Sequence, residues 1–306
     1  LSRQPPRLPN STPHFSPHPV VTPTTEETTL HVAQGSYTLH RLPPRKRELL
    51  RAWDAADEYL LNTLAEKSLL SEESRLLIVN DSFGALAVAL SEYRPQSLSD
   101  SWLCHEATRR NLVTNGLAED AVILLDPLSL PQGPLDLVLI KAPKTLALLE
   151  DELIRIAPVL RPQTQVIIAG MVKGMPSSLW QLLERLLGPT TTSLAKKKAK
   201  LIFVTAAKLS SMPASPYPSC YPLEGTTHRI CNHANVFSRD SLDIGTRFFL
   251  QHLPENLGDR DVIDLGCGNG VVGLIAAARN PSARLHFVDE SYMAVASAQE
   301  NFRHNL

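Results

Sequence analysis

Apolar positions alternate between strand-length runs and helix-length patterns from residue 49 onward. Residues 49–65 carry apolar side chains at helical spacing, the continuous apolar run at 76–79 is typical of a buried parallel strand, and 85–90 return to helical spacing. This alternation predicts an α/β fold. The other expected strands are 122–125, 135–140, 165–169, 201–204, 262–265 and 285–288; the other expected helices are 102–115, 145–157, 178–187, 247–253, 271–279 and a last one running to the end of the chain.

The same plan of strand, turn, helix, strand and helix occurs twice. Asp100 precedes a helix in the first copy as Asp289 does in the second, and Asn111 in that helix corresponds to Asn301. The turn after the first strand holds three glycines in the second copy but one in the first. Because the bulky Phe83 in the first turn would obstruct a ligand, we expect a ligand site in the second copy alone.

The patterns divide the chain into four parts. Residues 1–29 are rich in Pro, Ser and Thr, so we expect a disordered tail. The first copy occupies 30–208, and 226–306 hold the second copy, which stops after its second strand and helix. Residues 209–225, with four prolines and several serines, are the expected linker.

Composition excludes some classes of protein. The net charge is −1, so a contact with nucleic acid would depend on local patches. One such patch is expected to bind RNA; it consists of Lys196, Lys197, Lys198 and Lys200. The four cysteines have no C-x-x-C spacing, and we expect reduced thiols in a cytoplasmic protein without a metal site or a membrane span. For His228 and His233 we expect local hydrogen bonds; a pair that binds one ligand is the alternative.

The glycine-rich turn of the second copy is typical of a nucleotide site, because glycines let the backbone approach a ligand and a helix N-terminus faces it. Gly268, Gly270 and Gly273 fit the dinucleotide pattern G-x-G-x-x-G, which alone is weak. The carboxylate of Asp264 at the mouth of the loop disfavours a pyrophosphate and suits a cationic ligand end. The D-x-G-x-G-x-G stretch that begins at Asp264 resembles motif I of the class I S-adenosylmethionine-dependent methyltransferases.

The chain as a whole resembles the ribosomal RNA guanine-N2 methyltransferases, and within them the large-subunit enzymes. The resemblance rests on VFSRDSLDIGTRFFLQHLPENL, VIDLGCGNGVVGL and FVDES, and on first-copy segments such as NDSFGALAVAL and IKAPKTLALLEDEL. It implies two tandem Rossmann-like class I methyltransferase domains, the second incomplete, with the first serving RNA binding. It also implies a monomer that uses S-adenosylmethionine to methylate guanine N2 in large-subunit ribosomal RNA.

The resemblance carries site residues over by position. Asp289 would hold the ribose hydroxyls of the cofactor. The methionine end would be closed over by Asp243, Gly245 and Thr246. The other expected cofactor residues are Asp264, Gly266, Cys267, Gly268, Asn269 and Gly270.

The family's catalytic Asn-Pro-Pro-aromatic motif, whose carbonyls would accept the guanine N2 hydrogens while the aromatic stacks on the base, is absent. In the first copy Lys141 stands at its place, 41 residues after Asp100, and the same count from Asp289 reaches 330, beyond Leu306. We therefore expect a truncated and inactive catalytic copy. A small-subunit enzyme, a non-catalytic RNA-binding or assembly module, and a nicotinamide dehydrogenase are the alternatives.

Overall fold

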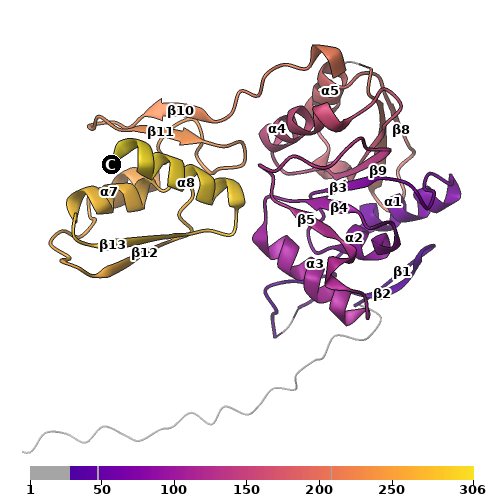
Figure 1. Ribbon diagram of the computed structural model, residues 1–306, viewed down its shortest axis with the longest axis horizontal. Helices are drawn as coiled ribbons and strands as arrows, with labels where there is room; N and C mark the ends of the chain where they lie inside the picture. Colours follow the sequence, from indigo (N-terminus) through magenta and orange to yellow (C-terminus); the bar gives the residue numbers. More distant parts are fainter. Residues whose placement is uncertain (1–27, 47, 208) are drawn as a thin grey trace, which may run out of the picture.

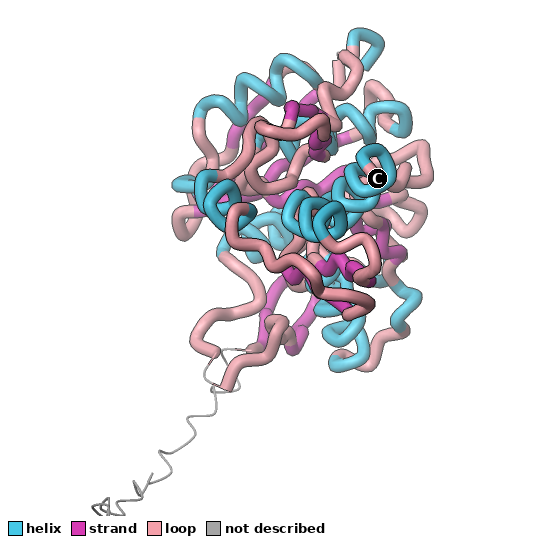
Figure 2. Tube along the Cα trace, turned by 90° about the vertical axis from the view of Figure 1, so that its left-hand side faces the viewer, coloured by secondary structure: helices cyan, strands magenta, loops and turns pink. Residues whose placement is uncertain are grey.

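The computed structural model describes residues 28–46, 48–207 and 209–306 (Figure 1). The expected tail at 1–29 lies outside these residues except for its last two, and the second of them, Thr29, already begins a strand. The first copy lies to the right in Figure 1 and the second copy, in orange and yellow, to the left. Figure 2 views the chain from the side of the second copy, with the C-terminal helix toward the viewer.

The first copy is built on a seven-stranded sheet in the order β5-β4-β3-β6-β7-β9-β8. Its central strand β3 (Leu76–Val79) is parallel to both neighbours, with Leu77 opposite Gln96 of β4 and Val138 of β6. Only the β9 end of the sheet is antiparallel. The other strands are β4 (Gln96–Leu98), β5 (Ile123–Leu125), β6 (Leu137–Lys141), β7 (Gln165–Met171), β8 (Thr190–Thr192) and β9 (Ala199–Thr205).

Helices cover both faces of this sheet, which is why the central strands are apolar along their whole length. Leu76 and Ile78 of β3 belong to a core cluster with α1 and α2, whereas Leu77 and Val79 belong to a second cluster with α4 and α5. The expectation of an α/β fold is confirmed. The helices are α1 (Ala55–Glu66), α2 (Ala85–Ala89), α3 (Trp102–Thr114), α4 (Leu146–Ile156) and α5 (Ser177–Leu186), with short 3₁₀ turns at Ser91–Tyr93, Glu119–Ala121, Ala157–Val159, Val172–Gly174 and Leu209–Ser211.

The second copy contains fewer strands. Its β12 (Asp261–Leu265) and β13 (Arg284–Val288) are parallel and pair in a sheet of two, while α7 (Val271–Arg279) and α8 (Tyr292–Asn305) pack on one face. On β12, Ile263 and Leu265 are 65% and 81% exposed. The remaining elements are the antiparallel hairpin of β10 (Ser219–Pro222) and β11 (Arg229–Asn232), and α6 (Ile244–Leu250). The second copy therefore has an uncovered apolar surface, as expected from its pattern.

The two copies share a hydrogen-bond plan that extends the repeat seen in the sequence. The Asn111 side chain accepts from the amide of His40 and donates to the carbonyls of His40 and Phe83. In α8, Asn301 makes the same three bonds to Cys231 and to the carbonyl of Asn269.

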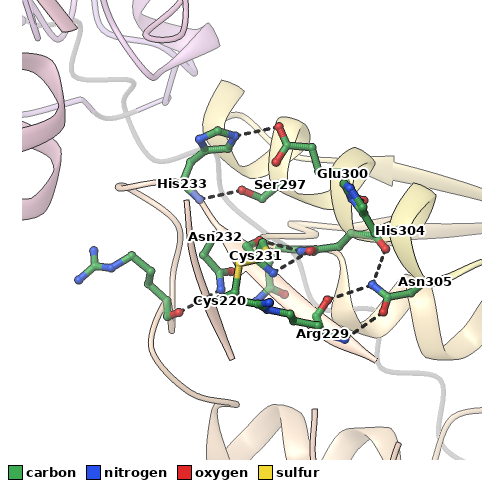
Figure 3. Close-up of a disulfide and its surroundings, with 12 residues drawn as sticks. Cys220, Arg229, Cys231, Asn232, His233, Ser297, Glu300, His304 and Asn305 are labelled. Atoms are coloured by element: carbon green, nitrogen blue, oxygen red, sulfur yellow. Dashed lines mark hydrogen bonds and ion pairs between the residues drawn. A yellow bond between two sulfur atoms is a disulfide. The ribbon is translucent and has the colours of Figure 1, made fainter. Parts of the chain in front are cut away.

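One turn further on, Asn115 and Asn305 each bridge both backbone groups of one residue, Thr38 or Arg229 (Figure 3). The hairpin of β1 (Thr29–Val32) and β2 (Gly35–Thr38) is thus the first-copy equivalent of β10 and β11. The sequence pattern favours a short strand within 228–236, where β11 lies, but it predicts neither hairpin.

Three element boundaries differ from the expectations. The helix expected at 247–253 is α6, which begins at Ile244 because Asp243 caps it and ends at Leu250. The helix expected at 49–65 begins only at Ala55, because Asp54 and Asp57 form a capping box there, and Leu49 and Leu50 are exposed. The linker expected at 209–225 includes strand β10, since Ser219–Pro222 pair with β11. Short exposed loops and short hairpin strands have too few apolar residues to show the periodicity of a helix or a strand.

The expectation of four reduced thiols is wrong for two of them. Cys220 and Cys231 are directly opposite each other on β10 and β11 and form a disulfide (Figure 3). The sequence spacing of eleven residues hid a pairing that the hairpin creates. Cys104 and Cys267 are free and buried.

The copies meet at a junction with approximate two-fold symmetry. Ser101 and Ser291, the N-caps of α3 and α8, form an isolated antiparallel bridge. The Ser101 hydroxyl donates to Glu290 (2.6 Å), and the Ser291 hydroxyl donates to Asp100 (2.7 Å). Asp100 is therefore equivalent to Glu290, and the expected match of Asp100 with Asp289 is off by one residue.

Candidate functional site

A hollow of about 250 Å³ lies at the carboxyl end of β12, between the glycine turn and the N-terminus of α6. Most of the expected cofactor residues line it, namely Asp243, Thr246, Asp264, Gly266, Cys267, Gly268, Asn269 and Asp289. Gly245 and Gly270 were expected there too but do not line it. Sequence reasoning missed Tyr221, Phe237, Ser238, Leu242, Val271 and Val272 as lining residues, although the VFSRDSLD segment holds three of these six.

The glycines of the turn serve two purposes. Gly266 and Gly268 have φ of 73° and 54°, and a Cβ on either would meet nothing within 4 Å, so their backbone faces open space. A Cβ on Gly270 would lie 2.7 Å from the Cβ of Ala298 in α8. The first two glycines therefore make room for a ligand, whereas Gly270 allows α8 to pack against the turn.

The carboxylates give the hollow a negative field. Burial raises the pKa of Asp264, and the charge of Asp289 adds to this, although the Gly273 amide donates to Asp264 (2.9 Å) and opposes the shift. Burial, Asp289 and Asp264 together raise the pKa of the Cys267 thiol to about 12. Burial is the largest cause of both shifts, and the charges of Asp264 and Asp289 are the part that favours a cationic ligand.

Hydrogen bonds on both sides fix the Asp289 carboxylate. One oxygen accepts from the Gly268 amide (2.9 Å) and the other from the Ser291 amide (2.9 Å). Ser291 is held in turn by Asp100 of the first copy, which also accepts from the Met293 amide (2.8 Å). The two copies are thus joined directly behind the expected ribose-binding acid.

Asp243 is the N-cap of α6. Its side chain accepts from the amide (2.9 Å) and the hydroxyl (3.4 Å) of Thr246. This arrangement brings the N-terminus of the short helix to the rim of the hollow.

Known proteins are similar to this chain over most of its length. The RLMG N-terminal domain model matches residues 27–208, and the methyltransferase small domain model matches 227–306. A protein of Erwinia tasmaniensis named ribosomal RNA large subunit methyltransferase G is 52% identical over 277 residues, which cover 90% of this chain and 72% of that protein. Proteins of the same name from Ectopseudomonas mendocina and Streptomyces griseus are 53% and 48% identical over 88% and 89% of this chain.

The chain belongs to the ribosomal RNA large subunit methyltransferase G family. It is an rRNA methyltransferase by this membership, and its cofactor is S-adenosylmethionine. Among solved structures, a T. thermophilus 16S rRNA N2 methyltransferase in complex with AdoMet and guanosine has a TM-score of 0.66, with 21% identity over 91% of this chain and 72% of that one. At this identity the likeness establishes the fold.

The hollow fits this family's cofactor. Its open backbone at Gly266 and Gly268 leaves space, and the carboxylates of Asp264 and Asp289 suit a ligand that carries an ammonium and a sulfonium. A nicotinamide dinucleotide would bring a pyrophosphate, which these carboxylates would repel.

The first copy of this family member has different residues at the corresponding positions. Gly84 is equivalent to Gly270, so Ile78 is at the position that corresponds to Asp264. Ser99 corresponds to Asp289, because each lies two residues before the N-cap of the following helix. Phe83 is partly buried in the first-copy core. The first copy therefore lacks both acids that define the hollow.

The four lysines expected to contact RNA lie at the hairpin between β8 and β9. Lys196 pairs with Glu66 (3.8 Å) and Lys197 with Glu58 (2.7 Å), so two of the four lysines have a carboxylate partner. Lys198 and Lys200 have no carboxylate at ion-pair distance within the described part of the chain.

The remaining expectations concern two histidines, metal sites and membrane spans. His233 is buried and pairs with Glu300 (3.2 Å), while the amide of His228 donates to Thr226, so the two histidines form no ligand pair. Within residues 28–46, 48–207 and 209–306, no group of three His, Cys, Asp or Glu side chains could hold a metal ion. In the same residues, no helix combines the length and the apolar character needed to cross a bilayer.

Proposed function

We propose that the protein methylates the exocyclic N2 of a guanine in large-subunit ribosomal RNA. The observation that carries the proposal is the hollow with Asp243, Asp264 and Asp289 at the glycine turn of the second copy. The family supports ribosomal RNA as substrate, and the structural neighbour, whose printed title names N2 methylation and a guanosine complex, supports the choice of atom.

The residues of the hollow have separate proposed tasks. Asp289 would accept hydrogen bonds from the two ribose hydroxyls, since Gly268 and Ser291 already hold its carboxylate in a fixed orientation. Asp264 would stabilise the cationic end by charge, and Asp243 with Thr246 would close the hollow over the amino-acid end. S-adenosylmethionine supplies a methyl group bonded to a positively charged sulfur.

Transfer to guanine also needs groups that hold the base. The lone pair of N2 is delocalised into the ring, so acceptors must orient the amino group. No Asn-Pro-Pro sequence occurs among the 306 residues. The tasks proposed above therefore concern the cofactor alone.

The proposal also includes the cellular location, the oligomeric state and the RNA-binding surface. The protein would act as a cytoplasmic monomer, and the first copy would contact RNA through the lysines that have no carboxylate partner. A small-subunit target is less well supported, because the relatives at about 50% identity are named for the large subunit, whereas the 16S enzyme is 21% identical.

Tritium transfer from labelled S-adenosylmethionine to protein-free ribosomal RNA would test the proposal. We would assay the chain beside the Erwinia tasmaniensis relative, of which it covers 72%. Label should appear in large-subunit RNA, with N2-methylguanosine as the labelled nucleoside. Label in small-subunit RNA, or on another atom, would contradict the proposal.

A further inference from the structure

A buried lysine sits between two acids in the first copy, away from the hollow. Lys141 ends strand β6, and its side chain is only 12% exposed. Its ammonium donates to Asp54 (2.8 Å) and to Asp57 (2.6 Å), both at the N-terminus of α1. The Asp57 side chain is 7% exposed.

The repeat makes these residues equivalent to those of the cofactor hollow. Asp54 is the N-cap of α1 as Asp243 is the N-cap of α6, and each lies between a hairpin and the first strand of its copy. Three residues after these caps stand Asp57 and Thr246. The Lys141 ammonium therefore occupies the first-copy counterpart of the place where the second copy would hold the amino-acid end of its ligand.

A third acid completes the cluster. Asp81 stands three residues before Gly84, as Cys267 stands three before Gly270. Burial, and next the charge of Asp57, raise the pKa of Asp81 to about 7, and Lys141 opposes the shift.

Burial lowers the pKa of Lys141, but Asp57 and Asp54 outweigh it, so the net shift is upward and the ammonium stays charged. Lys141 is thus hydrogen-bonded to two carboxylates at the start of α1, and the buried Asp81 in the turn after β3 interacts with Asp57 and Lys141 through charge.

We propose that the first copy retains a binding site for a primary ammonium group, and that Lys141 fills it with its own side chain. The site explains why a copy without ligand keeps buried acids where they would otherwise destabilise the fold. It also means that the first copy would reject the cofactor even if Phe83 were removed. The contacts of Lys141 do not depend on the proposed function, whereas their comparison with the second copy rests on the place proposed there for the amino-acid end of the cofactor.

Removal of the lysine tests the proposal. Lys141→Ala vacates the site and leaves the acids unpaired, so the melting temperature should fall by about 10 °C. At constant ionic strength, n-butylammonium chloride should then raise the melting temperature of the variant in a saturable way, and tetramethylammonium should not. The wild type and Lys144→Ala, which changes an exposed lysine of the same loop, should respond to neither ion.

A second variant covers the case in which Lys141→Ala does not fold. Lys141→Met fills the volume without the charge. Burial raises the pKa of Asp57 and of Asp81, so without Lys141 these two acids take up protons more readily at pH 5 than at pH 8. The stability deficit of Lys141→Met against the wild type should therefore be larger at pH 8 than at pH 5. Equal rescue by both ammonium ions, no rescue of a folded Lys141→Ala, or a Lys141→Met deficit that does not change with pH would overturn the proposal.

Discussion

Asp100 offers the sharpest test of how the two copies cooperate. It lies in the first copy and is buried (4% exposed), yet its carboxylate accepts from three groups outside that copy. These are the Ser291 hydroxyl (2.7 Å), the Met293 amide (2.8 Å) and the Asn235 side chain (2.7 Å). We predict that Asp100→Ala weakens cofactor binding, although Asp100 does not line the hollow.

The magnitude follows from these contacts. Three hydrogen bonds to a charged group contribute about 1.5–3 kcal/mol each. Burial, which raises the pKa of Asp100, offsets several kcal/mol of that sum, so Asp100→Ala should lower the free energy of unfolding by about 2–4 kcal/mol. Release of Ser291 would also free roughly one residue of the Asp289 loop, and re-ordering it on binding costs about 1–2 kcal/mol, which is about a tenfold rise in Kd.

Calorimetry with S-adenosylmethionine would measure the Kd, and urea unfolding would measure stability. Ser101→Ala is the matched control, because it removes the symmetric bond from Ser101 to Glu290 and a helix cap at the same junction but leaves Ser291 and Asp289 in place. It should destabilise the chain while changing the Kd by less than about twofold. If both variants changed the Kd equally, Asp100 would not act on cofactor binding through Ser291 and Asp289.

Three further predictions concern other parts of the chain. Replacement of all four hairpin lysines with Gln should reduce the slope of log binding constant against log salt concentration by about 1.4–1.8, because only Lys198 and Lys200 lack a carboxylate partner. A reduction that corresponds to four lost phosphate contacts would contradict this. Burial raises the pKa of Glu152 to about 8, so its folded form holds a proton that the unfolded form loses above about pH 4.5. Stability should therefore fall as pH rises toward 8, and Glu152→Gln should remove a few kcal/mol of that dependence in urea unfolding at pH 5 and 8. Thiol titration of the unfolded, unreduced chain should find two thiols, and Cys220→Ser with Cys231→Ser should lower the free energy of unfolding by about 2–3 kcal/mol, while four thiols would contradict the disulfide.

The sequence was most informative where a residue type has a narrow physical use. Three glycines directly after Asp264 restricted the turn of the second copy enough to predict its ligand class. Long apolar runs such as β3 and β6 predicted the parallel sheet, because only a sheet covered on both faces buries every side chain of a strand.

Other features depended on contacts between distant residues, which no local pattern reveals. The hairpin of β10 and β11 is short and half exposed, and it alone brings Cys220 opposite Cys231. Lys196 and Lys197 have carboxylate partners only because the β8–β9 turn lies against α1, which is distant in the sequence. Likewise, Lys141 was noticed for its position in the sequence, but its two acid partners come from a helix more than eighty residues earlier.

Isothermal titration of the 306-residue chain would show whether the second copy binds S-adenosylmethionine in the hollow at Asp264 and Asp289. We predict binding of S-adenosylmethionine and no binding of NAD. Asp289→Ala should weaken the affinity for S-adenosylmethionine by about 10- to 100-fold, equivalent to one or two lost hydrogen bonds. Binding of NAD alone, or an affinity for S-adenosylmethionine that Asp289→Ala leaves unchanged, would contradict this prediction.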